Sequence, residues 1–227
     1  MLKKAFEFAE SVHLGKVKED CVYDNRGGAG ILYKIDDNAI YLAFAGLNDA
    51  DDLTAIGNSD IRLKYGTINS SILERYLEIY SILPEFPTNL PMYISGYSLG
   101  GAIAFLFALL NMEKYNIDSV YSFGSPKFSK IDTRLLVDTS KVKSKFVRVI
   151  VKHDPVAMYP LFGDWFHFGE SLVLNDNKKE SKFYKLVRIL HLGEYNNWVN
   201  LLYLLLFTVF SQNQNHDLNT YRRLIND

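Results

Sequence analysis

The chain has 227 residues and a formal net charge of -1, from 25 basic and 26 acidic side chains, and 48% of its residues are hydrophobic. This composition excludes a largely disordered chain, and the balanced charge excludes a protein that binds nucleic acid through a basic surface. The single Cys21 excludes an internal disulfide and favours the cytoplasm. We therefore expect one domain over residues 1–227, located in the cytoplasm, with no nucleic-acid partner.

The first third of the chain predicts a helix, a hairpin and a second helix. Residues 1–16 alternate charged and apolar side chains at helical spacing, which indicates an amphipathic helix instead of a secretory signal. Apolar, β-rich runs at residues 31–35 and 40–44 flank three turn-forming polar residues, which is typical of a hairpin. Apolar residues recur at helical spacing over residues 68–83, and Pro84 then ends the pattern.

The middle of the chain alternates strand-like and helix-like segments. A short apolar segment at residues 91–95 precedes a helical pattern at residues 99–112. Strand-like runs at residues 119–123 and 146–151 flank a helical pattern at residues 130–137. Strands that alternate with helices predict the α/β class, with a mainly parallel sheet covered by helices on both faces.

The last quarter of the chain predicts one more strand and an apolar helix. Residues 165–174 are strand-like, and a helical pattern follows a polar break at residues 175–180. The most apolar run, residues 198–210, contains Asn200 and is shorter than the roughly 20 residues of a membrane-spanning helix. It predicts a helix that either lies in the core or presents an apolar face to a lipid interface.

The segment from Gly96 to Gly101 reads GYSLGG and fits the pattern G-x-S-x-G at a predicted junction of strand and helix. On such a tight turn the serine side chain projects at the edge of the sheet, and the flanking glycines let strand and helix cross. The first N–H groups of the helix favour negative charge. Ser98 is therefore the predicted nucleophile, and the Leu99 amide is a predicted oxyanion donor. The alternative is a glycine-rich turn with an incidental serine.

This elbow resembles that of the class 3 lipases, the family of fungal lipases and plant phospholipases A1, which usually reads GHSLGG; Tyr97 stands in place of the histidine. Four further segments are similar to the family in the same order: YLAFAG at 41–46, YSFGSPK at 121–127, VRVIVKHDPVAMYP at 147–160 and HFGE at 167–170. The resemblance covers about residues 20–221. It implies an α/β-hydrolase fold and an esterase that needs neither cofactor nor metal.

A serine nucleophile needs a base and an acid that orients the base, and in α/β hydrolases these follow the serine in the order acid, histidine. Asp154 directly follows a predicted strand and matches the acid position in the family's D-P-V segment. The alternative is a turn-forming aspartate before Pro155. Among the five histidines, chain order excludes His13, and the side chain of His153 should point away from its neighbour Asp154.

His216 is the predicted base. It lies in a polar loop and begins an H-x-L-x-x-Y segment similar to the one at the catalytic histidine of plant phospholipase-like members. The alternative is a solvated loop histidine. His167 in a predicted strand and His191 in a predicted helix are not favoured.

The second oxyanion donor is expected from the loop that begins at Gly46, as the backbone amide of Leu47. The family usually has arginine before this glycine and threonine or serine after it. Ala45 and Leu47 leave the backbone amide as the only donor there. Three acidic residues between positions 49 and 52 suggest either a metal site or a solvated loop, and the loop is favoured, so no metal is expected.

The sequence as a whole predicts a serine esterase or lipase that hydrolyses acylglycerols or phospholipids through Ser98, His216 and Asp154. The expected partners are a lipid or acyl-ester substrate and, at the periphery, a lipid interface. Two alternatives remain open. One is a thioesterase or acyltransferase on the same fold, since fold and triad do not fix the acyl acceptor. The other is a lipid-binding regulatory protein with weak turnover, which Ala45 and Leu47 favour.

Overall fold

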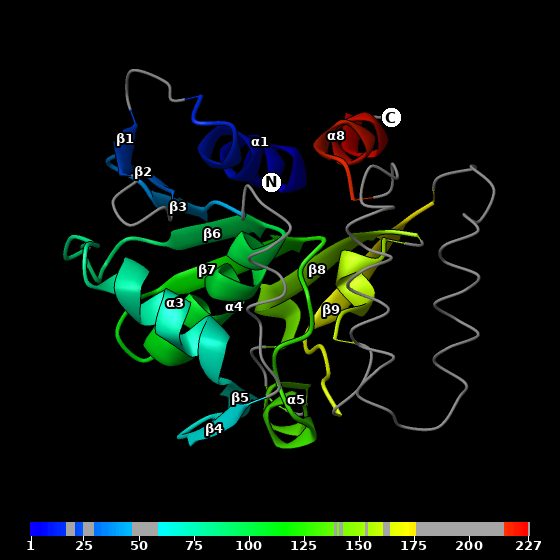
Figure 1. Ribbon diagram of the computed structural model, residues 1–227. Helices are drawn as coiled ribbons and strands as arrows, with labels where there is room; N and C mark the ends of the chain where they lie inside the picture. The colour runs from blue at the N-terminus through cyan, green and yellow to red at the C-terminus, as the bar shows by residue number, and fades with distance from the viewer. Residues whose placement is uncertain are drawn as a thin grey trace.

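A computed structural model of the protein describes residues 1–16, 21–24, 30–46, 59–138, 140, 143–152, 154–160, 164–175 and 216–226. In this part of the chain a central sheet is covered by helices on both faces (Figure 1). The helices are α1 (Leu2–His13), α3 (Ser70–Tyr80), α4 (Leu99–Asn111), α5 (Ile131–Asp138) and α8 (Leu218–Asn226), with the 3-10 turns η2 (Lys143–Lys145) and η3 (Val156–Met158).

The central sheet of the described residues has the strand order β1-β2-β3-β6-β7-β8-β9. The first three strands pair antiparallel, and every pair from β3 to β9 is parallel. The predicted mainly parallel α/β fold is therefore confirmed. The strands are β1 (Val22–Asp24), β2 (Ile31–Ile35), β3 (Ile40–Phe44), β6 (Met92–Tyr97), β7 (Ile117–Phe123), β8 (Phe146–Val151) and β9 (Glu170–Leu174).

The predicted hairpin is the pair β2 and β3, and it leads the chain to the centre of the sheet. The Asp36 carboxylate accepts hydrogen bonds from the backbone N–H groups of Asn38 at 3.0 Å and Ala39 at 2.9 Å, which closes the turn. Strand β3 then pairs parallel with β6, so that Phe44 lies beside Gly96. The loop after β3 consequently begins next to the turn that carries the predicted nucleophile.

Helix α4 is buried along almost its whole length because it packs between the sheet and α3. Its sequence, LGGAIAFLFALLN, is apolar on every side, as burial on several sides requires. On the other face α1 and α8 pack side by side over the sheet (Figure 1). There the Phe6 ring contacts Phe123 edge-on at 5.2 Å and stacks on Tyr221 at 6.5 Å, while the Arg222 Nε donates to Glu10 at 2.9 Å.

Two predicted boundaries are wrong for local physical reasons. The helix predicted from residue 68 begins at Ser70, because the Asn69 side chain caps it by accepting from the Ile72 N–H at 3.2 Å. The residues before it form a separate hairpin of β4 (Asp60–Leu63) and β5 (Gly66–Asn69) that the pattern did not reveal. The strand predicted from residue 165 begins only at Glu170, since Gly169 has a φ of +82° that interrupts the extended chain.

None of the helices in the described ranges combines the length and the apolarity that crossing a bilayer requires. The apolar segment at residues 198–210 lies outside the described residues, so its two interpretations stay open. The single-domain organisation and the cytoplasmic location stay predictions.

Candidate active site

The predicted nucleophile Ser98 lies on a sharp turn between β6 and α4, so the predicted order of strand, turn and helix is confirmed. Its φ of 55° and ψ of -127° are a strained combination for a residue other than glycine. The turn is tight enough that a Cβ on Gly96 would lie 2.1 Å from the carbonyl oxygen of Gly100. Only glycine fits at position 96, because any side chain there would collide with the start of α4. This tight turn lets the Ser98 side chain project from the end of the strand.

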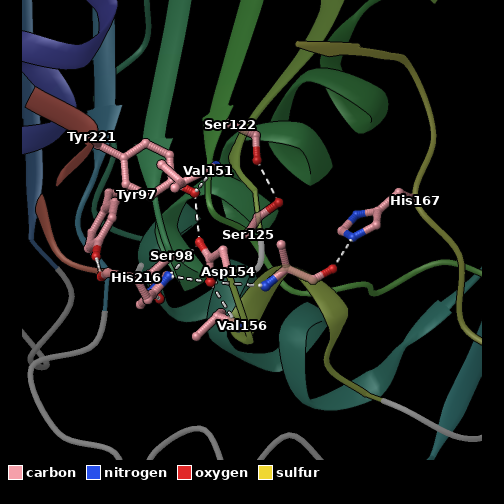
Figure 2. Close-up of polar contacts among 11 residues, drawn as sticks. Tyr97, Ser98, Ser122, Ser125, Val151, Asp154, Val156, His167, His216 and Tyr221 are labelled. Carbon is pink, nitrogen blue, oxygen red and sulfur yellow. Dashed lines mark hydrogen bonds and ion pairs between the residues drawn. The ribbon is translucent and has the colours of Figure 1, made fainter. Parts of the chain in front are cut away.

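The structure brings Ser98, His216 and Asp154 together in one hydrogen-bonded chain (Figure 2). The Ser98 Oγ lies 3.0 Å from the His216 Nε2, and the His216 Nδ1 lies 3.0 and 2.9 Å from the two Asp154 carboxylate oxygens. The carboxylate beside Nδ1 favours a proton on that nitrogen, which leaves Nε2 as an acceptor. The imidazole is thus placed to take the proton of the serine hydroxyl.

The Asp154 side chain is fully buried, and neighbouring donors compensate its charge. Its Oδ1 accepts from the Val156 N–H at 2.9 Å, and its Oδ2 accepts from the Tyr221 hydroxyl at 2.6 Å. The Tyr221 oxygen in turn accepts from the Val151 N–H at 3.1 Å. Burial raises the pKa of Tyr221 well above its usual value, and the negative charge of Asp154 adds to this, so the hydroxyl remains a donor.

Gly124, directly after β7, leaves the space in which acid and base meet. Its φ is +61°, and a Cβ there would lie 2.7 Å from the Asp154 Oδ2, 2.8 Å from the Tyr221 hydroxyl and 3.0 Å from the His216 Cε1. Any side chain at this position would displace these groups. This close approach explains the glycine of the YSFGSPK segment.

The predicted oxyanion donors lie on either side of the serine. Leu99 is the first residue of α4, so its N–H is one of the four that have no partner within the helix. Gly46 follows β3 and contacts the turn, since a Cβ on it would lie 3.0 Å from the Ser98 Cβ. Leu47 lies outside the described residues, and its role stays a prediction.

The remaining histidines occupy other positions. His13 ends α1, and burial lowers its pKa below the usual 6.5. The sequence predicts His167 within a strand, but it lies before β9. Its Nε2 is 2.7 Å from the Ala157 carbonyl oxygen of η3. Loss of solvation lowers the pKa of His167 well below its usual value, so at neutral pH the ring is an uncharged support for this turn. His153 and His191 lie outside the described residues.

No cluster of three or more His, Cys, Asp or Glu side chains in the described ranges is arranged to hold a metal ion. Of the acidic residues around the loop after β3, Asp60 lies in β4 and its carboxylate is 3.6 Å from the Lys130 ammonium group. The other three, between positions 49 and 52, lie outside the described residues.

Two tyrosines contribute contacts that the sequence pattern does not predict. Tyr221 donates to Asp154, and Tyr97 stacks on the imidazole of His216 with ring centroids 5.0 Å apart. The signals were present, since Tyr221 belongs to the H-x-L-x-x-Y segment and Tyr97 is the departure from the usual GHSLGG. Their partners, however, lie 67 and 119 residues away along the chain, which no local pattern reveals.

We expect Tyr221→Phe to lower kcat by about tenfold and the free energy of unfolding by about 1–3 kcal/mol, since it leaves the Val151 N–H and one Asp154 oxygen short of a partner. Ester hydrolysis and denaturant unfolding measure the two effects. The matched control is Tyr76→Phe, which also removes a buried tyrosine hydroxyl. That hydroxyl accepts a hydrogen bond from the Asn111 side chain at 3.0 Å and belongs to α3, not to the site around Ser98. Equal kcat values in the two variants would contradict a role for Tyr221 in holding the acid.

Comparisons with known proteins show what this chain is similar to. A family model described as lipase (class 3) matches residues 52–163, and no curated protein matches the chain. Lip2 lipase from Yarrowia lipolytica is 15% identical with a TM-score of 0.59 over 76% of this chain and 78% of that one. Lipase II from Rhizopus niveus is 20% identical with a TM-score of 0.60 over 79% and 81%.

A triacylglyceride lipase from Rhizomucor miehei is 18% identical with a TM-score of 0.60 over 78% of this chain and 79% of that one. At these identities the structural likeness shows the fold, which is that of the fungal lipases. The family model adds the sequence relationship, and its match spans β4 to η3, including the serine turn and Asp154. Over residues 52–163 the chain matches the class 3 lipase family, and its fold is that of the fungal lipases.

Proposed function

We propose that this protein hydrolyses carboxylic esters of lipids through an acyl-enzyme on Ser98, with His216 as the general base and Asp154 as the acid that orients it. The observation that carries the proposal is the continuous hydrogen-bonded chain from the Ser98 Oγ through the imidazole to the buried carboxylate. A non-catalytic, lipid-binding protein would have no need of this alignment, which counts against that alternative.

The chemistry follows from the positions of these groups. The His216 Nε2 takes the serine proton as the Oγ attacks the ester carbonyl carbon, and the resulting imidazolium faces the negative charge of Asp154. The tetrahedral intermediate collapses when the imidazolium gives this proton to the leaving alkoxide. Water then attacks the acyl-serine by the same proton transfers and releases the carboxylic acid, which restores Ser98.

Negative charge that develops on the carbonyl oxygen requires donors beside the nucleophile. We propose the backbone N–H groups of Leu99 and Leu47 for this role, since α4 begins at Leu99 and the loop after β3 begins against Ser98. The family's usual hydroxyl side chain is replaced by Leu47. The missing donor costs about 1–3 kcal/mol of transition-state stabilisation, which slows the reaction without preventing it.

The substrate class that we propose is the acylglycerols or phospholipids. The match to the class 3 lipases over residues 52–163 supports a lipid ester, and the Rhizomucor miehei neighbour is described as a triacylglyceride lipase. The net charge of -1 provides no field that would select an anionic headgroup. The enzyme would therefore recognise its substrate mainly through the apolar acyl chain. A lipid interface would be a peripheral partner.

A series of nitrophenyl esters of graded acyl length tests this proposal. Each methylene that becomes buried on binding contributes about 0.8 kcal/mol, so kcat/KM should rise up to about fourfold per methylene until the binding groove is filled. Phospholipids and mono- to triacylglycerols then define the headgroup. A rate that does not change with acyl length would contradict a lipid substrate, and faster cleavage of acyl thioesters than of oxygen esters would favour the thioesterase alternative.

A further inference from the structure

Tyr97, the residue before the nucleophile, lies between two imidazole rings. Its ring stacks on that of His216 with centroids 5.0 Å apart and an interplanar angle of 18°, and the His13 ring contacts it edge-on at 5.1 Å. Figure 2 shows Tyr97 beside His216. Only 4% of Tyr97 is exposed, so this aromatic contact is part of the core and not a surface encounter.

The Tyr97 hydroxyl makes a second contact with the same residue, because it donates a hydrogen bond to the main-chain carbonyl of His216. Burial raises the pKa of Tyr97 well above its usual value, and the charges of Asp154 and Asp217 raise it further. The hydroxyl therefore keeps its proton and stays a donor at every pH at which the enzyme would work. One side chain thus holds both the ring and the backbone of the base.

The position of His216 explains why such support matters. It is two residues before α8 begins, so the helix hydrogen bonds do not fix its backbone. Asp154 holds the Nδ1 side of the ring, but hydrogen bonds at one edge still allow the imidazole plane to tilt about that edge. A stacked ring resists this tilt, and an offset or parallel aromatic contact of this kind contributes to the preferred orientation.

The same strand end supplies both the nucleophile and this support. Tyr97 is the last residue of β6 and Ser98 follows it directly, so one backbone segment sets the place of the serine Oγ and of the ring against which the base lies. Reacting groups have to be held to within about 0.5 Å, and a displacement of about 1 Å can cost about 100-fold in rate. The end of β6 therefore helps to set the distance between the Ser98 Oγ and the His216 imidazole.

We propose that Tyr97 is a positioning residue for His216, which it holds by ring stacking and by the hydrogen bond from its hydroxyl to the His216 carbonyl. This role rests on the proposed function of Ser98, His216 and Asp154. It also assigns a purpose to the one position of the GYSLGG turn that departs from the usual GHSLGG. Because Tyr97 acts on the base and not on the substrate, its removal should lower kcat and leave KM unchanged.

Tyr97→Phe and Tyr97→Leu separate the two contacts. The phenylalanine keeps the stacked ring and loses the hydroxyl, and we expect kcat to fall about tenfold; the leucine loses both, and we expect a fall of about 100-fold, with KM within about twofold of the wild-type value in each case. Tyr76→Phe is the matched control, since it also removes a buried tyrosine hydroxyl but lies away from His216. Activity of Tyr97→Leu equal to that of the control would overturn the proposal.

A readout that needs no turnover separates this proposal from the proposed function. In protein labelled with 15N-histidine and carrying Ser98→Ala, the His216 imidazole should give one sharp set of resonances with the proton on Nδ1. Adding Tyr97→Leu should broaden these resonances or mix the two tautomers, and adding Tyr76→Phe should not. If wild-type protein hydrolyses no ester, the proposed function fails while this measurement still tests Tyr97; unchanged His216 resonances in the Tyr97→Leu protein would sink the positioning role.

Discussion

Ser98→Ala is expected to abolish ester hydrolysis in a protein that remains folded. The substitution removes the attacking Oγ, which lies 3.0 Å from the His216 Nε2, so the acyl intermediate can no longer form on this residue. Loss of a triad member typically lowers kcat by about 10⁴–10⁶-fold. Alanine is smaller than serine and the glycines of the turn remain, so the melting temperature should change by only a few degrees.

Ser129→Ala is a suitable control for this experiment. Ser129 is fully buried, and its Oγ donates to the Phe166 carbonyl at 2.9 Å, so the control also removes a buried serine hydroxyl. Nitrophenyl ester hydrolysis and thermal unfolding are measured for both variants. Activity of Ser98→Ala at or near the wild-type level would show that the acyl-enzyme mechanism is wrong, and equal losses in both variants would point to a general effect on the fold.

The second large effect is expected from the base and the acid. His216→Ala and Asp154→Asn should each lower kcat by about 10³–10⁴-fold, because the first removes the proton acceptor and the second removes the charge that keeps the proton on Nδ1. Combining either change with Ser98→Ala should add little, since the three residues act as one unit. Additive losses in these double variants would contradict a shared mechanism.

The other histidines provide the comparison for this prediction. His167 supports η3 through the Ala157 carbonyl and does not contact Ser98, so His167→Ala should affect stability more than kcat. His191→Ala should leave kcat close to the wild-type value. If either of these substitutions abolishes ester hydrolysis while His216→Ala does not, His216 is not the general base.

The core of the fold and the strand-turn-helix order around Ser98 could be predicted because their signals are local, whereas the choice of Asp154 and His216 rested on the resemblance to the class 3 lipases. The glycines around Ser98 are required by a close approach within a few residues, and Asp154 follows a strand whose bounds at residues 146–151 the pattern gave correctly. Helix α4 has the apolar length that a buried helix requires. Each of these features depends on residues close by in the chain, and sequence patterns carry information mainly over such short separations.

The features that could not be predicted depend on distant contacts. Tyr221 lies on α8, which contacts α1 through Arg222 and Glu10, and it reaches Asp154 across 67 residues of the chain; Tyr97 at the end of β6 stacks on His216, just before α8. The beginning of β9 depends on a positive φ at Gly169, which the strand-like residues around it concealed. Tertiary packing overrides local pattern at these places.

The most direct test of this account is the reaction of the wild-type protein with a fluorophosphonate probe, followed by mass spectrometry of its peptides. The serine Oγ displaces fluoride from phosphorus, and the adduct should appear on the peptide that contains Ser98. Ser98→Ala should give no adduct, and His216→Ala should react much more slowly because its serine has no base. An adduct on another residue, or a folded wild-type protein that does not react, would contradict the claim that Ser98 is an activated nucleophile.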